Sequence, residues 1–129
     1  MTGRVLGMAI GMGAALRSPL WITGPRLQRL LRDAPGSARG SRAPEPATSA
    51  AVLALRVLAR IPLLPWRNTC LYRSVAECLA LRSCGIGCRL ELGVSHDPAS
   101  DHSVVAHAWV ERNDRPPADH PHVPLRPAP

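Results

Sequence analysis

The middle of the chain most constrains the fold, because one helix pattern is followed directly by two strand patterns. Asn68 or Thr69 can cap a helix, apolar residues then recur at helical spacing, and Gly85 stands where such a helix would stop. Residues 88–94 and 104–112 alternate apolar and polar side chains, as strands with one buried face do. This order predicts an α+β fold in which helices pack on one side of a small antiparallel sheet.

The first half of the chain predicts further helices. Residues 5–16 form an apolar run about half as long as a membrane span, and we interpret it as a packed helix rather than a targeting segment. Pro25 fits the first turn of a second, short helix. Residues 50–61 are amphipathic, with Arg56 and Arg60 one turn apart on the polar face.

The chain divides into four parts by composition. We expect an N-terminal helical segment at 1–33, a linker rich in Pro, Ala, Ser and Arg at 34–49, a core at 50–123 and a Pro-rich tail at 124–129. A total of 129 residues allows one domain with a modest core. After the second strand the chain is expected to return near Val123 as an edge strand, which completes an antiparallel meander.

The strongly basic composition does not indicate nucleic acid. A formal charge of +7 and a pI near 10.9 usually suggest an anionic partner. Here all 16 basic residues are Arg, and they are spread from Arg4 to Arg126 without a dense block. Together with 14 Pro and abundant Ala and Gly, this pattern indicates codon bias, so we expect no nucleic-acid partner.

The positions of the four cysteines select one nucleophile. No convincing secretory signal accompanies them, so we expect a reduced, cytoplasmic protein. A cysteine reacts as its thiolate, and the N-terminus of a helix favours an anion. Cys70 meets this condition, whereas Cys78 lies on the apolar stripe, Cys84 sits at the helix C-terminus and Cys88 starts a strand. Position alone therefore favours Cys70.

One histidine and one aspartate complete a candidate triad. His107 is the only histidine within a predicted strand. Histidines in strands are usually structural, but a cysteine at the start of a nearby helix favours a role for His107 as a general base. A third group must orient the imidazole. Asp119 is better placed to orient the imidazole than Asp114, because the Asp114 side chain is expected to stabilise the predicted turn at 113–114. Trp109 either shields His107 from solvent or is an ordinary core aromatic.

Two other interpretations stay open. Cys84, Cys88, His120 and His122 could hold zinc, but they lack the spacing of a zinc knuckle, so we expect no metal or cofactor. A peptide-binding or acyl-transfer protein of the same fold is the other alternative. The same three residues would serve hydrolysis and acyl transfer equally, so the sequence leaves these reactions open.

Four segments carry a resemblance to a known family. They are Cys70-Leu71-Tyr72-Arg73-Ser74-Val75-Ala76, Leu81-Arg82-Ser83-Cys84-Gly85-Ile86, Leu92-Gly93-Val94 and Ala106-His107-Ala108-Trp109-Val110-Glu111. Together these segments resemble the lasso-peptide leader peptidases, which belong to the transglutaminase-like branch of the papain-type cysteine proteases. The similarity covers about residues 50–123.

The resemblance implies a cysteine peptidase whose catalytic Cys, His and Asp fall on Cys70, His107 and Asp119. Such an enzyme cuts the leader from a ribosomally made lasso precursor peptide, beside an ATP-dependent macrolactam cyclase, and it needs no cofactor. Some family members carry a leader-recognition domain at their N-terminus. Residues 1–49 are too short and too linker-like to form it, so a separate small leader-recognition protein is expected as a partner.

Overall fold

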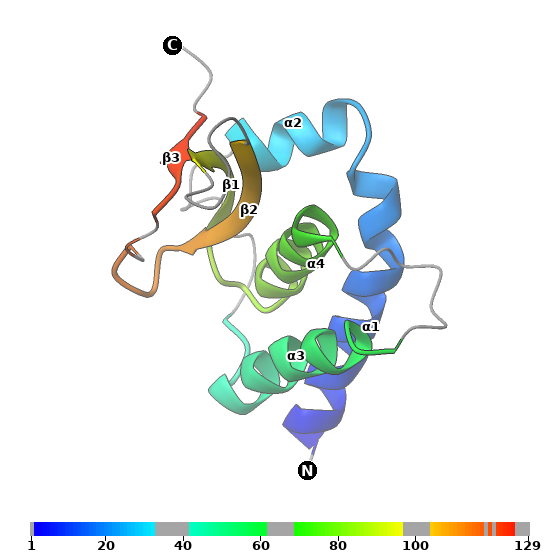
Figure 1. Cartoon of the computed structure of the whole chain (residues 1–129). Helices are drawn as coiled ribbons and strands as arrows, with labels where there is room; N and C mark the ends of the chain where they lie inside the picture. The colour runs from blue at the N-terminus through cyan, green and yellow to red at the C-terminus, as the bar shows by residue number, and fades with distance from the viewer. Residues whose placement is uncertain are drawn as a thin grey trace.

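The computed structural model describes residues 2–32, 42–61, 69–96, 104–117, 119 and 121–125. These residues form four helices packed on a small antiparallel sheet of three strands, which confirms the predicted α+β class (Figure 1). In chain order the elements are α1 (Thr2–Trp21), α2 (Pro25–Arg32), α3 (Glu45–Leu58), α4 (Cys70–Ser83), β1 (Cys88–His96), β2 (Val104–Arg112) and β3 (Val123–Pro124).

Helix α4 forms the centre of the fold, with α1, α2 and α3 around it and the sheet on its remaining side (Figure 1). Val75 and Leu81 of α4 are fully buried against Leu90 of β1. The opposite side of α4 carries small side chains that let α1 and α3 approach closely. This second core cluster consists of Ala14, Ala15, Ala51, Leu55, Ala76, Ala80 and Cys84.

Two glycines on α1 set its distance from α3. A Cβ added to Gly7 would overlap the carbonyl oxygen of Ala47, and one added to Gly11 would lie 2.5 Å from the carbonyl oxygen of Ala51. Both obstacles are backbone atoms of α3, which cannot move aside as a flexible side chain can. The close contact of the two helices therefore requires glycine at both positions.

We expect Gly7→Ala and Gly13→Ala to change stability in opposite directions. Gly7→Ala should lower the free energy of unfolding by about 1–3 kcal/mol, because the two helices must separate to admit the methyl group. Gly13 lies on the same helix with nothing within 4 Å of an added Cβ. Alanine there should raise the free energy of unfolding by roughly 0.5–1 kcal/mol through helix propensity alone. Urea denaturation measures both, and equal effects of the two changes would contradict this account of the α1–α3 contact.

The sheet order is β2-β1-β3, so the predicted meander is wrong. The third strand does return near Val123 as predicted, but it pairs antiparallel with β1, opposite Val94, and not with β2. The reason lies at the outer edge of β2. There Ser74 of α4 donates a hydrogen bond to the carbonyl oxygen of Ala108 over 2.8 Å, so α4 occupies that edge at Ala108, and β3 pairs with the free edge of β1 instead.

The boundaries of the N-terminal elements also differ from the prediction. Helix α1 is longer than residues 5–16, and α3 begins at Glu45, so the last residues of the predicted linker are helical. Proline in the first turn and an acidic residue beside it both favour a helix start. Residues 34–41 of the linker and residues 126–129 of the tail lie outside the described residues.

Helices α1 and α2 meet at a bend of 116°. Only this pair, taken together, has the length and composition of a membrane span; within the described ranges no single helix does.

Candidate active site

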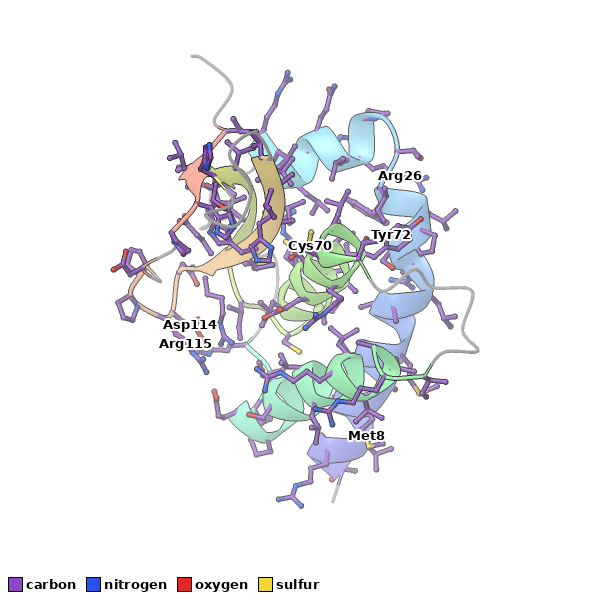
Figure 2. All side chains as sticks on the ribbon, in the orientation of Figure 1. Met8, Arg26, Cys70, Tyr72, Asp114 and Arg115 are labelled. Carbon is purple, nitrogen blue, oxygen red and sulfur yellow. The ribbon has the colours of Figure 1, made fainter. Side chains whose placement is uncertain are left out.

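Cys70 is the first residue of α4, as predicted. Thr69 caps the helix, since its side-chain oxygen accepts a hydrogen bond from the backbone N–H of Tyr72 over 3.4 Å; the alternative cap, Asn68, lies outside the described residues. The Cys70 side chain is half-buried. Figure 2 shows it at the N-terminal end of α4, on the opposite side of the helix from Tyr72. The thiol is therefore accessible and lies where the helix dipole favours an anion.

The first turns of α4 are tied directly to the middle of β2. Ser74, one helical turn after Cys70, is buried and donates to the carbonyl oxygen of Ala108. Ala108 follows His107 in the strand. This hydrogen bond brings the cysteine segment and the histidine segment side by side, although they are far apart in the sequence. The sequence did not reveal the role of Ser74, because the oxygen it bonds belongs to a strand 34 residues away.

His107 lies in the middle of β2 and is half-buried. Its ring stacks on that of His122, with centroids 4.8 Å apart, and on that of Trp109 at 6.3 Å. Side chains alternate along a strand, and Val110, of the opposite parity, packs into the core cluster with α4. The His107 ring is therefore directed across the sheet toward β3. Of the two roles that the sequence allowed for Trp109, the structure shows the indole stacked beside the His107 imidazole.

Gly93 makes this arrangement possible. It is the partner of His107 in β1, and it lies between β2 and β3. A Cβ at Gly93 would lie 2.7 Å from atoms of the Trp109 indole and 2.8 Å from the carbonyl oxygen of Val123. Any side chain here would push the aromatic rings or β3 off the sheet. His122 was considered from the sequence only as a metal ligand, since the Pro-rich tail has no periodicity that could place it.

The two candidate aspartates differ sharply in their surroundings. Asp119 is exposed, between two residues that lie outside the described ranges. Asp114 accepts two hydrogen bonds of 2.8 Å from Arg112 and a third of 3.1 Å from Arg42. The hydrogen bonds from Arg112 hold the pKa of the Asp114 carboxyl below its usual range. The Asp114 carboxylate is therefore occupied by its two arginine partners at the turn. That Asp119 orients the His107 imidazole stays a prediction.

We expect Asp114→Asn to destabilise the fold at neutral pH only. A carboxyl whose pKa is lowered by folding contributes stability above its unfolded pKa of about 3.9, and this contribution is lost as pH falls through the folded pKa. The variant should lose about 1–2 kcal/mol of unfolding free energy at pH 7. Denaturation at pH 7 and near pH 2 checks this. A loss of equal size at both pH values would count against it, and Asp119→Asn, at an exposed carboxyl, serves as the control.

The other three cysteines are buried, unlike Cys70. Cys78 and Cys88 are buried between α4 and β1 with their sulfur atoms 3.2 Å apart. The hydrogen bond with Cys88, together with burial, raises the pKa of the Cys78 thiol. Burial also raises the pKa of Cys84. Cys70 is the least buried of the four thiols.

The zinc interpretation is not supported by the described geometry. Cys88 faces α4, whereas His122 stacks on His107 on the other face of the sheet. His120 lies outside the described residues. Among the described positions, no group of three or more His, Cys, Asp or Glu side chains could hold a metal ion.

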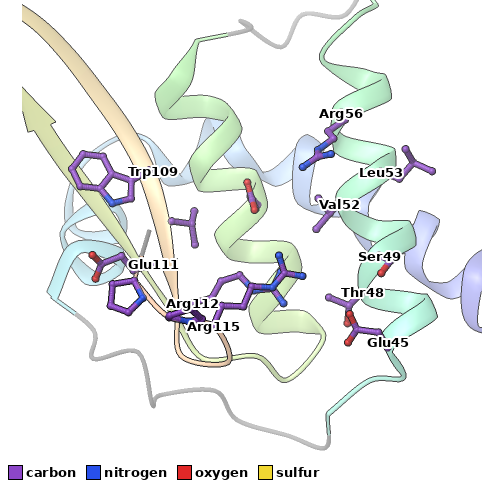
Figure 3. A pocket seen from close by; sticks show the side chains of 14 residues that line it. Glu45, Thr48, Ser49, Val52, Leu53, Arg56, Trp109, Glu111, Arg112 and Arg115 are labelled. Atoms are coloured by element: carbon purple, nitrogen blue, oxygen red, sulfur yellow. The ribbon is translucent and has the colours of Figure 1, made fainter. Parts of the chain in front are cut away.

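A cavity of about 550 Å³ opens between α3 and the outer edge of β2 (Figure 3). In Figure 3, Val52 and Arg56 extend from α3 toward α4, and Trp109, Glu111 and Arg112 come from β2. The lining mixes three carboxylates, three guanidinium groups and apolar side chains. They are Glu45, Thr48, Ser49, Val52, Leu53, Arg56, Glu77, Trp109, Val110, Glu111, Arg112, Arg115, Pro116 and Pro117.

Comparison with known proteins places the chain in a family. A sequence model described as the transglutaminase-like superfamily matches residues 12–127, which is nearly the whole chain. No curated protein and no solved structure matches it. A cysteine at the start of a central helix, packed beside a small antiparallel sheet, is consistent with a fold used for cysteine peptidase or acyl-transfer chemistry. The chain belongs to the transglutaminase-like superfamily.

Proposed function

We propose that this protein is a cysteine peptidase that removes the leader from a ribosomally synthesised lasso-peptide precursor. The hydrogen bond from Ser74 to Ala108 carries the proposal, because it holds the helix start with Cys70 against the strand with His107. Superfamily membership supports the class of chemistry. The resemblance of the segments around Cys70 and His107 to leader peptidases supports the substrate.

In the proposed mechanism the thiolate of Cys70 attacks the carbonyl carbon at the leader–core junction, after His107 takes the thiol proton. The backbone N–H of Cys70, unpaired within the helix, donates to the oxyanion. The C–N bond breaks as His107 protonates the leaving amine, and a thioester remains. Water, activated by His107, then releases the leader as a carboxylate and restores the thiol. Asp119 orients the imidazole.

This mechanism requires the His107 ring to turn from the β3 side of the sheet toward α4. Because His107 lies on the face of the sheet opposite the core cluster with α4, its ring must pass around the outer edge of β2 to reach Cys70, and rotation about its side-chain torsions is the first part of that movement. Catalytic hydrogen bonds are often long or misaligned without substrate and tighten only in the complex. Stacking on His122 and Trp109 would then hold the imidazole when no substrate is bound.

Acyl transfer to an amine is the second candidate, since the superfamily also supports transferases. The two reactions share the thioester and differ in the final acceptor. The mass of the released leader separates them, because hydrolysis adds water and transfer adds the amine.

We also propose a separate leader-recognition protein and an ATP-dependent macrolactam cyclase as partners in the cytoplasm. The outward surface of α1 supports a protein partner, because it presents several exposed apolar side chains beside the exposed cations Arg4 and Arg17, a pattern typical of an interaction surface. These side chains are Val5, Leu6, Met8, Met12, Leu16 and Leu20. Four free thiols support a reducing compartment.

Reconstitution tests the proposal. The purified chain, the recognition protein and the precursor peptide are mixed, and the products are followed by mass spectrometry. We expect cleavage at a single junction and a leader with a free carboxylate. Intact precursor after prolonged incubation with all components would overturn the proposal.

A further inference from the structure

Helix α1 presents its large apolar side chains outward and its small ones inward. Gly7, Gly11, Ala14 and Ser18 are buried, and α1 packs through this side on α3 and α4. The opposite side carries six apolar side chains that are each between 51% and 72% exposed. We call this set the apolar arc, and it consists of Val5, Leu6, Met8, Met12, Leu16 and Leu20. A surface helix of a globular protein usually has the reverse arrangement, with its large apolar side chains toward the core.

The apolar arc is bordered by a cation on each side. At about 100° of rotation per residue, Arg4 projects next to Met8 at one margin of the arc, and Arg17 projects next to Leu6 at the other. Both arginines are exposed. An arginine at such a margin can lay its stem on the apolar surface and extend its guanidinium group into the headgroups of a bilayer. This cross-section is typical of a helix that lies in the plane of a membrane surface.

The charge around the arc has one sign. Residues 2–32 include α1 and α2 and hold five Arg but no Asp or Glu, since all nine acidic residues lie at position 33 or beyond. The five arginines are Arg4, Arg17, Arg26, Arg29 and Arg32. All are exposed, and none forms an ion pair with another residue that the structure describes. Figure 2 shows Arg26 beside the C-terminal end of α1. This part of the chain is therefore complementary to an anionic surface.

An exposed apolar patch fits either a protein partner or a bilayer. Protein interfaces are enriched in aromatic side chains and pair charges of opposite sign. The apolar arc has only aliphatic and thioether side chains, and its surroundings have only cations. A bilayer with anionic lipid matches both features, because its hydrocarbon accepts aliphatic side chains of any shape and its headgroups attract cations. Since α3 and α4 occupy the inward side of α1, the helix would lie along the bilayer surface.

We propose that the apolar arc docks the protein on an anionic phospholipid bilayer. The arc is buried at the boundary between headgroups and acyl chains, and the arginines of α1 and α2 lie against the lipid phosphates. Docking of this kind is peripheral and reversible, because only one face of one helix enters the bilayer and salt screens the attraction of the cations. The proposal goes beyond the proposed function and does not depend on it.

Co-sedimentation with vesicles tests the docking. The full chain is mixed with sucrose-loaded vesicles of phosphatidylcholine, either pure or with an equal amount of phosphatidylglycerol. We expect partitioning into the anionic vesicles to be at least about tenfold stronger, since each cation near an anionic surface contributes about fivefold. Raising the salt concentration from about 0.1 M to about 0.5 M should weaken this partitioning several-fold.

A matched pair of variants locates the contact. Leu16→Asp places a carboxylate in the middle of the apolar arc and should lower partitioning into the anionic vesicles at least about tenfold. Leu125→Asp makes the same change at another exposed leucine, next to β3 and on the opposite side of the fold from α1 (Figure 1). It lowers the net charge equally and should leave partitioning nearly unchanged. Thermal melting checks that each variant folds, and Leu16→Gln takes the place of Leu16→Asp if that variant does not.

Three outcomes would overturn the docking: no binding to anionic vesicles at about 1 mM lipid, equal binding to both kinds of vesicle, or an equal loss in Leu16→Asp and Leu125→Asp. If the wild-type chain ignores vesicles while Leu16→Asp loses the recognition protein or dissociates a dimer in size-exclusion chromatography, the arc is a protein interface and the proposal fails. None of these outcomes affects Cys70-dependent cleavage of a precursor, which tests the proposed function separately.

Discussion

Cys70→Ala should abolish leader release, with a loss of at least about a thousandfold in rate. The reason is that the proposed reaction passes through a thioester on this sulfur, and alanine offers no nucleophile. His107→Ala should cause a similar loss, because the proposed mechanism assigns the thiol proton to its imidazole. Rates of leader release from the reconstituted mixture, followed by mass spectrometry, measure both.

The buried thiols provide the matched controls for the loss of Cys70. Cys84→Ala removes a sulfur that is fully buried at the end of α4, and it should retain most of the activity. Cys78→Ala and Cys88→Ala should do so too, at the cost of about 1 kcal/mol of stability each from the space they leave. Full activity in Cys70→Ala, or a loss shared equally by all four variants, would contradict the assignment of the nucleophile.

Ser74→Ala should lower kcat by about 10- to 100-fold while changing KM little. Ser74 does not take part in the chemistry; it is a positioning residue that holds α4 against β2 through Ala108. Alanine leaves the buried edge of β2 without its donor, so the distance between Cys70 and His107 is no longer fixed. The free energy of unfolding should also fall by about 1–2 kcal/mol.

Ser83→Ala is the control for Ser74→Ala. It tests whether the fall in kcat requires loss of the hydroxyl at position 74 or follows loss of any serine hydroxyl on α4. Ser83 lies on the same helix, and its hydroxyl donates over 2.9 Å to the carbonyl oxygen of Leu79, away from β2. Its replacement should leave kcat unchanged. Ser74→Thr, which retains a hydroxyl, should recover part of the activity. A stability loss in Ser74→Ala with unchanged kcat would assign Ser74 to the fold alone.

Much of the fold follows from local signals in the sequence. The start of α4 at Cys70 was predictable because Thr69 is a capping residue, and its end was predictable because Gly85 adopts a positive φ of 73° after the last turn. The bounds of β2 were predictable because its side chains alternate up to the turn at 113–114. These features depend only on residues near one another in the chain.

The order of the strands was not predictable in this way. A meander satisfies the same local pattern as the observed order, and the choice depends on which edge of the sheet α4 covers. The start of α3 at Glu45 was missed for a related reason. Its first turn is rich in Pro, Ala, Thr and Ser, which is typical of a linker, and the turn is stabilised by packing of Ala47 and Thr48 in the interior.

In the candidate site, too, some features follow from local sequence and others depend on contacts between distant segments. The place of Cys70 at a helix start follows from sequence, and so does the place of His107 within a strand. The stacking of His107 on His122 does not, because it needs β3 to return beside β1 and Gly93 to leave room between the strands. Contacts between distant segments of the chain thus decide which way the imidazole is directed.

The central claim, that Cys70 carries the acyl group, is tested most directly by intact-protein mass spectrometry of the enzyme quenched with acid during turnover. We predict an adduct equal to the mass of the leader acyl group, mapped to Cys70 by peptide fragmentation, sensitive to hydroxylamine and absent from Cys70→Ala. Leader release without any adduct, accompanied by release in the Cys70→Ala protein, would contradict the account.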